Sequence, residues 1–269
     1  MRLFKYYSPK KYNFSAVAQQ KLFFSHPSNL NDPYDTTILN IQAYPLFCQC
    51  LQIDEKTLTT NLNKHAICCF SKGEQADNKH LWAFYASNYE GFAVEYSKEV
   101  IGNSAQMRGL PLQLFDVDYR EKPLDLDGDD FFIIKDTIPT ESEPQKYSVD
   151  QCINCYMQGD PILSDRLFTE LHLQKEKKIW KEENECRLII GNIISDNLDR
   201  RYFQKIGNIG IMYKLSARAI KSITIGYRIS PKNKRRITKI ASKLGVPLFQ
   251  ATPRIENGCW IVKIDEIRK

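Results

Sequence analysis

Short runs in which apolar and polar residues alternate recur along the chain and predict a protein built mainly from strands. Met1–Tyr7 and Phe92–Tyr96 are clear examples, and a period of two is typical of a strand with one buried face. Fewer segments have helical spacing, among them Ile162–Lys177. Because the strands follow one another closely, often without a helix between them, the pattern predicts an α+β fold with mostly antiparallel or mixed sheets and flanking helices.

The size and composition of the chain predict one domain over residues 1–269. With 42% apolar and 12% aromatic residues it can bury a full core. It contains no apolar run near the roughly 20 residues of a membrane span, and its N-terminus lacks the apolar region of a signal peptide. We therefore expect a cytoplasmic protein with no membrane partner. There, the eight cysteines should remain thiols, and their spacing lacks the paired CxxC frame of a zinc site, so we expect no metal.

Two segments of opposite charge depart from the modest net charge of +6. Residues around 116–143 are acidic and predict an exposed loop or insertion. Residues around 230–244 predict a helix that begins at Ser230-Pro231. This helix carries Lys232, Lys234, Arg235, Arg236, Lys239 and Lys243, with no acid. Such a surface suits a nucleic-acid or protein acceptor, although a solvated helix face is the commoner explanation for a basic run.

The run Trp180–Ile190 is the most informative, because it places charge inside a predicted strand. At period two, Glu183, Glu185 and Arg187 share one face. Carboxylates two residues apart on a strand lie roughly 7 Å from each other, close enough to hold one small ligand and costly to bury without one. The alternative is that the segment is still helical, and that Glu183 and Arg187 form a surface pair worth about 0.3–0.5 kcal/mol.

Six motifs, taken in order, resemble a bacterial family known as domain of unknown function 2971. The motifs are Leu3-Phe4-Lys5-Tyr6; Leu22-Phe23-Phe24-Ser25 with Asn31-Asp32-Pro33-Tyr34-Asp35; Cys69-Phe70-Ser71; Trp82-x-x-Tyr85 with Gly91; Trp180-x-x-Glu183-x-Glu185-x-Arg187; and Ile223-x-Ile225-Gly226. The resemblance runs from residue 3 to about residue 250. Cys186 departs from it, because the family more usually has an aromatic residue at that position.

The order of these elements is also similar to the ADP-ribosyltransferase fold with its split sheet, a likeness of architecture alone. It implies that the chain uses NAD as a substrate, without a metal, and transfers ADP-ribose to an acceptor or to water. Glu185 would stabilise the oxocarbenium-like transition state. Glu183 would orient or deprotonate the acceptor, and Arg187 would keep both acids ionised.

The same resemblance suggests which residues would hold NAD. Nicotinamide needs a flat aromatic wall, for which Phe70, Trp82 and Tyr85 are candidates. However, aromatic residues at helical spacing are more often part of a core. The phosphates need cations or free amides, for which Lys5 and the turn at Asn31-Asp32 are candidates. The remaining polar candidates of these motifs are Tyr6, Ser25 and Ser71. Lys5 and Tyr6 stand where those transferases usually present His or Arg.

Two other classes of protein remain open from the sequence. A metal-dependent nuclease would use Asp116 and Asp118 with Glu183 and Glu185, while the basic helix grips phosphates. A non-catalytic interaction or sensor module would use Glu183 and Arg187 to join the late strand to a neighbour, with Trp180 in the core. The acceptor is open, as is the choice between a toxin, a phage-defence effector and a housekeeping enzyme.

Overall fold

The computed structural model describes residues 2–32, 48–49, 51–108, 110, 112–122, 131–133, 146–148, 151, 154, 157–159, 168–191 and 198–267. The strands are β1 (Arg2–Tyr7), β2 (Lys21–Ser25), β3 (Ala66–Gly73), β4 (Phe92–Tyr96), β5 (Leu112–Asp116), β6 (Asp118–Arg120), β7 (Phe131–Ile133), β8 (Lys146–Ser148), β9 (Gln174–Glu176), β10 (Glu185–Ile190), β11 (Phe203–Ile206), β12 (Gly210–Lys214), β13 (Ile220–Gly226), β14 (Leu248–Glu256) and β15 (Cys259–Glu266). The helices are α1 (Lys11–Ala18), η1 (Pro27–Asn29), α3 (Glu55–Leu62), α4 (Lys79–Phe84), α5 (Lys98–Met107), α8 (Lys177–Trp180), η2 (Lys181–Glu183) and α9 (Pro231–Leu244).

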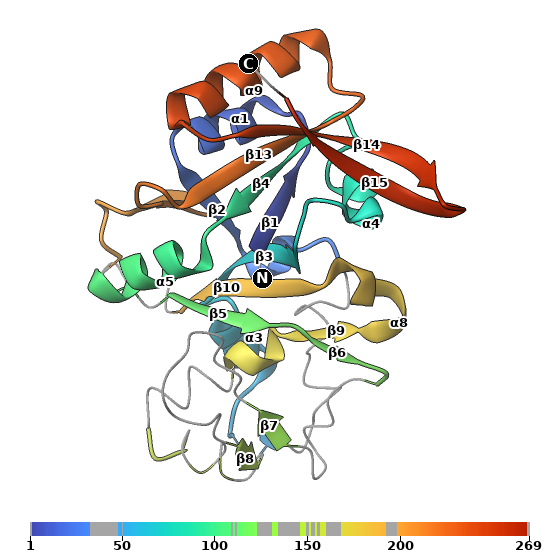
Figure 1. Cartoon of the computed structure of the whole chain (residues 1–269). Helices are drawn as coiled ribbons and strands as arrows, with labels where there is room; N and C mark the ends of the chain where they lie inside the picture. The colour runs from blue at the N-terminus through green and yellow to red at the C-terminus, as the bar shows by residue number, and fades with distance from the viewer. Residues whose placement is uncertain are drawn as a thin grey trace.

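Within the described residues, eleven strands form one large mixed sheet, which confirms the predicted α+β fold with flanking helices (Figure 1). The order along its main path is β11-β12-β2-β3-β1-β4-β13-β14-β15, and β10 joins β3 to β5. Most neighbours are antiparallel, whereas β13 and β14 are parallel because α9 connects them. The pairs β6-β9 and β7-β8 form two separate small sheets.

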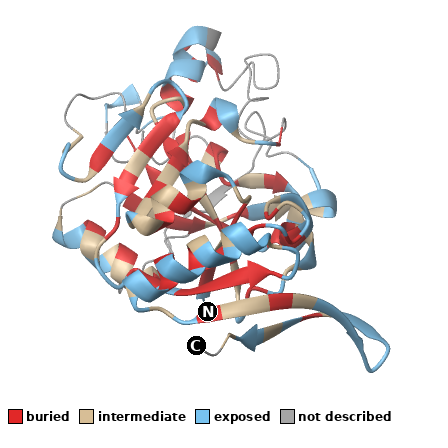
Figure 2. Ribbon diagram, turned by 90° about the horizontal axis from the view of Figure 1, so that it is seen from above, coloured by how far each residue is buried: buried red, intermediate tan, exposed pale blue. Residues whose placement is uncertain are grey.

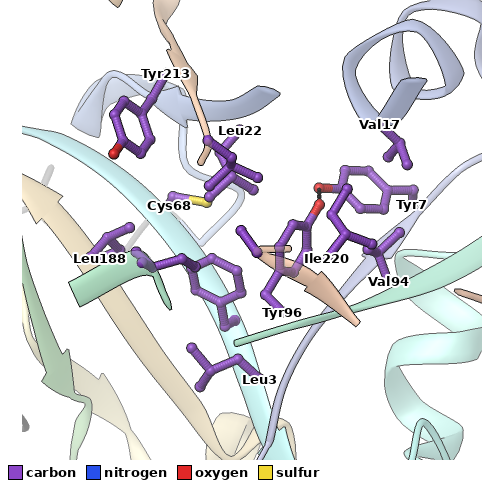
Figure 3. Packing of buried hydrophobic residues seen from close by; sticks show 14 of the residues in the cluster. Leu3, Tyr7, Val17, Leu22, Cys68, Val94, Tyr96, Leu188, Tyr213 and Ile220 are labelled. Carbon is purple, nitrogen blue, oxygen red and sulfur yellow. Dashed lines mark hydrogen bonds between the residues drawn. The ribbon is translucent and has the colours of Figure 1, made fainter. Parts of the chain in front are cut away.

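The large sheet forks at β3. One edge of β3 pairs with β10 along Ala66–Ser71. The other edge pairs with β1 near Ser71 and with β2 at Ile67, so β1 and β2 begin two branches. Side chains of both branches, such as Leu22 and Tyr7, belong to the same buried cluster (Figure 3). The fork therefore leaves part of one edge of β3 open to side chains rather than to another strand.

Helices cover both faces of the sheet. The apolar sides of α1, α5 and α9 pack on the main cluster, through residues that include Phe14, Ile101 and Ile237. A smaller cluster on the opposite face is centred on Trp82 of α4, which is fully buried and stacks on Tyr89. The middle of the sheet is buried, while the outer sides of the helices and the tip of the β14–β15 hairpin are exposed (Figure 2). No helix in the described part of the chain is both long and apolar enough to span a membrane.

The basic helix forms at the predicted place. The hydroxyl of Ser230 accepts a hydrogen bond from the backbone N–H of Asn233, and Pro231 occupies the first turn, where its missing N–H costs nothing. The helix ends at Gly245, which has the left-handed conformation common after a helix.

Two predicted elements were wrong. Trp180–Glu183 is not strand but the end of α8 followed by η2, because its Lys and Glu residues are good helix formers. The strand begins at Glu185, after Asn184 turns the chain with a φ of 44°. Gln174–Glu176, predicted as helix, is strand β9; residues 162–167 of that predicted helix lie outside the described residues.

The acidic segment is only partly described. Its beginning is regular rather than a loop, because Asp116 ends β5 and Asp118–Arg120 forms β6. Residues 131–133 form β7, and residues 123–130 and 134–143 lie outside the described residues. Pro33–Asp35, the end of the predicted turn after Asn31-Asp32, also lies outside them.

Candidate functional site

A cavity of about 80 Å³ lies between β1, β3, α4, β9 and the η2–β10 connection. Its walls are formed by Phe4, Lys5, Tyr6, Leu30, Asn31, Cys69, Phe70, Ser71, Leu81, Tyr85, Lys175, Glu183 and Glu185. Aromatic rings and charged side chains therefore border the same small space. Such a combination of apolar walls and a few converging polar groups is typical of small-molecule sites.

Glu183 and Glu185 meet at the ammonium group of Lys175. Lys175 Nζ donates to Glu183 Oε2 at 2.6 Å and to Glu185 Oε2 at 3.0 Å. All three side chains are at most 5% exposed. The ring of Trp180 covers the ammonium group, with its centroid 4.4 Å from Nζ. Because β9 and η2 are joined by the short helix α8, the chain folds back and brings Lys175 to both carboxylates.

Arg187 lies on the same face of β10 as Glu185 and is fully buried. Its Nε donates to Glu185 Oε1 at 2.9 Å, one terminal nitrogen reaches Glu185 Oε2 at 3.3 Å, and the other donates to the backbone carbonyl of His172. The surface pair of Glu183 with Arg187, which belonged to the helical alternative, does not form, because both side chains are buried and Arg187 bonds to Glu185. Arg187 holds Glu185 in place without lining the cavity.

The charges around Glu185 decide its ionisation. Burial by itself would raise the pKa of the Glu185 carboxyl, but Arg187 and Lys175 outweigh burial and lower the pKa to about 2. Burial would likewise lower the pKa of the Lys175 ammonium, and the charges of Glu185 and Glu183 raise it instead. Glu185 and Lys175 therefore stay ionised at neutral pH.

Tyr85 links Glu183 to the chain after η1. Its hydroxyl donates to Glu183 Oε1 at 2.8 Å and accepts a hydrogen bond from the side-chain amide of Asn31 at 2.9 Å. Burial, together with the charge of Glu183, raises the pKa of the Tyr85 hydroxyl, so it remains a donor. The backbone of Glu183 is fixed as well, because Ser71 Oγ donates to its carbonyl at 2.7 Å.

Lys5 lies where the sheet forks. Its ammonium donates to the backbone carbonyl of Cys69 at 3.0 Å, on the edge of β3 between the two branches. No acid among the described residues forms an ion pair with Lys5. Lys5 and Lys175 balance Glu183 and Glu185 among the groups that line the cavity. Because Lys175 serves both carboxylates, Lys5 is the cation placed to receive an anionic group of a ligand.

The structure brings most of the predicted site residues together. Eight of them line the cavity: Lys5, Tyr6, Asn31, Phe70, Ser71, Tyr85, Glu183 and Glu185. Four do not line it: Arg187 lies behind Glu185, and three others lie elsewhere. Trp82 is in the core and donates its ring N–H to the Ala76 carbonyl, the Ser25 hydroxyl donates to the His26 carbonyl, and the buried Asp32 does not line the cavity.

Five residues that line the cavity were not predicted from the sequence, and Lys175 is the charged one among them; the others are Phe4, Leu30, Cys69 and Leu81. Lys175 was placed in a predicted helix, whereas it lies in the middle of β9. A signal did exist, because two carboxylates predicted to be buried on one face need at least one buried cation beside Arg187. Charge balance would have pointed to a nearby Lys, although the sequence does not show which one.

The four acids proposed for a nuclease do not come together. Asp116 pairs with Lys72 at 2.7 Å, and its register partner on β10 is Cys186, whose side chain points to the face opposite Glu185. Asp118 pairs with Arg120 at 3.3 Å. In the described part of the chain no group of three or more His, Cys, Asp or Glu residues is arranged to hold a metal ion. Trp180, which the interaction-module alternative placed in the core, is partly exposed and covers Lys175.

Comparison with models of known protein families gives a match. The model of a family described as "Protein of unknown function (DUF2971)" matches residues 81–188. These residues run from α4 to β10 and include Tyr85, Lys175, Glu183, Glu185 and Arg187. The match supports the family resemblance drawn from the motifs, over this part of the chain. No curated protein and no solved structure gave a significant match. The likeness to the ADP-ribosyltransferase fold stays a prediction.

Proposed function

We propose that the cavity binds the nicotinamide–ribose end of NAD and that the chain is an ADP-ribosyltransferase or NAD glycohydrolase of cytoplasmic location. The observation that carries this proposal is the convergence of Glu183 and Glu185 on one buried ammonium, in a cavity that also has aromatic walls. A carboxylate held in this way stabilises an oxocarbenium-like transition state through its charge. The fork in the sheet next to Lys5 is in keeping with the split sheet expected of that class.

The hydrogen bonds suggest different roles for the two acids. A carboxylate has about four acceptor positions. Glu185 accepts three hydrogen bonds from Arg187 and Lys175, so little of its capacity remains. Glu183 accepts two, from Tyr85 and Lys175. We therefore assign the contact with a ribose hydroxyl to Glu183 and give Glu185 the role of positioning Lys175, in place of the transition-state role that the resemblance implied for Glu185.

The proposed reaction needs no group beyond the ligand and an acceptor. The bond between ribose C1′ and the nicotinamide nitrogen breaks, and its electron pair stays with the ring nitrogen. Water or an acceptor nucleophile then bonds to C1′ and releases a proton, which Glu183 accepts as the proposed base. Sites for whole ligands of drug size measure roughly 300–1,000 Å³, so the cavity of about 80 Å³ takes one end of NAD, and the adenosine end lies outside it.

Consumption of NAD would suit a toxin or a phage-defence effector, and we include such a role in the proposal.

A second candidate is a non-catalytic sensor that binds a negatively charged ligand at the same cavity. The three hydrogen bonds that Glu185 accepts favour it, because a carboxylate engaged by both Lys175 and Arg187 can serve as a structural anchor alone. Both candidates use the same residues, and they differ in whether the ligand is broken.

Thermal melting with and without millimolar NAD, measured alongside nicotinamide release, separates the candidates. A ligand at one hundred times its dissociation constant stabilises by about 2.7 kcal/mol. The enzyme proposal expects nicotinamide release that falls about a hundredfold or more in Glu183→Gln and is retained in Glu182→Gln, since Glu182 is the exposed neighbour. A melting shift without release would support the sensor. If NAD causes no melting shift and no nicotinamide is released, NAD is rejected as the ligand.

A further inference from the structure

The positive charge of the chain is concentrated on two helices. Lys10, α1 and α9 together contain eight Lys and Arg residues and no Asp or Glu. Because the whole chain has a formal net charge of +6, the remainder of the molecule carries −2. The excess is therefore a property of one region and does not reflect a basic protein as a whole.

The two helices lie side by side on the same face of the sheet, at the top of the molecule in Figure 1. The guanidinium group of Arg236 on α9 stacks over the ring of Phe14 on α1, 4.7 Å from its centroid. Phe14, Ile237 and Ile240 are buried beneath them. The outward sides of both helices therefore form one continuous surface, which we call the basic face.

The cations of α9 form a regular line. At 100° per residue, Lys232, Arg236, Lys239 and Lys243 point in nearly the same direction, and at 1.5 Å per residue they span about 16 Å. The three lysines are exposed, and no acid among the described residues forms an ion pair with any of the four. Lys10 and Lys11 are exposed at the start of α1. A line of cations without counter-charges repels itself, and a ligand with repeated negative charges removes that cost.

We propose that the basic face, formed by Lys10, Lys11, Lys232, Arg236, Lys239 and Lys243, binds the phosphate backbone of a nucleic acid. A nucleic-acid strand carries one charge per phosphate and releases counterions when cations replace them. Tyr12 is 64% exposed and lies beside Lys10, whose ammonium is 5.9 Å from the ring centroid. An exposed aromatic ring next to cations offers a stacking surface for an unpaired base, so a single strand should bind at least as tightly as a duplex.

A membrane is a poorer partner for this surface. A helix that binds an anionic bilayer inserts its apolar side into the headgroup region. The apolar side of α9 is already covered, because Ile237, Ile240 and Ala241 are buried in the core. The contacts left to the basic face are ionic, so the expected binding depends strongly on salt and weakly on sequence. This inference does not rest on the proposed use of NAD.

The test measures fluorescence polarisation of a labelled 20-nucleotide single strand, and of its duplex, at several salt concentrations. For the variant Lys232→Glu/Lys239→Glu/Lys243→Glu we expect a dissociation constant at least ten times larger than that of the wild type at 50 mM salt. The slope of log Kd against log salt should fall by about two for the single strand, because three contacts are lost. The matched control is Lys56→Glu/Lys122→Glu/Arg254→Glu, which reverses the same number of exposed charges on other parts of the surface and should bind within twofold of wild type.

Three results would overturn the inference. The first is no binding of either probe by the wild-type chain at 50 mM salt. The second is an equal loss in both triple variants, which would mean that the total charge and not the basic face is responsible. The third is binding to vesicles of anionic lipid in place of nucleic acid. All the substituted residues are exposed, and the melting temperature of each variant verifies that the fold is retained.

Discussion

The ammonium group of Lys175 lies 2.6 Å from one oxygen of the Glu183 carboxylate, and both side chains are buried. The two residues come from separate elements, β9 and η2, and the same ammonium also reaches Glu185. Two buried carboxylates and one ammonium are stable together because each charge has a partner in a region where water does not solvate it. The removal of the shared cation should therefore be costly.

Lys175→Met should lower the free energy of unfolding by about 3–5 kcal/mol, because it leaves buried negative charge with less compensation. The matched control is Lys177→Met. Lys177 pairs with Glu121 at 2.7 Å, but at the surface, with side-chain exposures of 41% and 71%, so the loss should be under about 1 kcal/mol. Urea unfolding of both variants provides the comparison. Equal losses would mean that the Lys175 ion pairs have no special weight.

Glu185 should make the protein sensitive to strong acid. Its pKa falls from the ordinary 4.5 to about 2 in the folded chain, so the folded state prefers the ionised form. The resulting stabilisation, about 3 kcal/mol, is present above pH 4.5 and is lost as the pH falls toward 2. NMR of the Glu185 carboxyl carbon should show titration close to pH 2. A midpoint above pH 4 would contradict this.

His172 should lower the stability of the folded state at a higher pH than Glu185 does, because the folded chain keeps the His172 ring neutral. Burial, with help from His65 and Arg187, holds the pKa of His172 well below its ordinary 6.5, so the folded state keeps the ring neutral. As the pH falls below 6.5, the unfolded state binds a proton that the folded state refuses, and stability declines by up to about 1.4 kcal/mol per pH unit. In His172→Gln this decline between pH 7 and 5 should shrink. His80→Gln, at a partly exposed histidine, should retain it.

The buried hydroxyls of Tyr7 and Tyr96 lie 2.8 Å apart in the main cluster (Figure 3). Either single Tyr→Phe change leaves the other hydroxyl buried without this partner and should cost about 1–3 kcal/mol. The double variant removes both polar groups and should be closer to wild type than the sum of the single losses. Thermal unfolding of the four proteins gives the coupling energy. Additive losses would show that the two hydroxyls do not depend on each other.

Gly226, the last residue of β13, should tolerate no side chain. A Cβ at this position would lie 2.0 Å from the carbonyl oxygen of Tyr89, so Gly226→Ala should cost about 3 kcal/mol or more. A Cβ at Gly207 meets open space, and there alanine should lose only about 1 kcal/mol, because φ is 52°. Circular dichroism melting compares the two variants. A similar small loss in both would contradict the close contact with Tyr89.

The alternation of apolar and polar residues was enough to locate many strands. Phe92–Tyr96 forms β4 with the expected bounds, and β1 runs over Arg2–Tyr7 of the predicted strand Met1–Tyr7, because a strand that buries one face has apolar residues at every second position. The start signal at Ser230-Pro231 located α9 in the same way. The sequence also predicted that Glu183 and Glu185 share a polar site. The two carboxylates do lie together at Lys175, although Glu183 is in η2 and not on the strand face that was predicted.

The tertiary structure alone decided which cation serves that site and where the cavity lies. Lys175 reaches Glu183 and Glu185 because α8 folds the chain back, and Lys5 reaches the carbonyl of Cys69 because β1 and β2 leave β3 at different points. Periodicity reports which face of a segment is buried, since burial acts on each residue separately. It does not report which segments become neighbours, because strand register and chain reversal depend on contacts between residues far apart in the sequence.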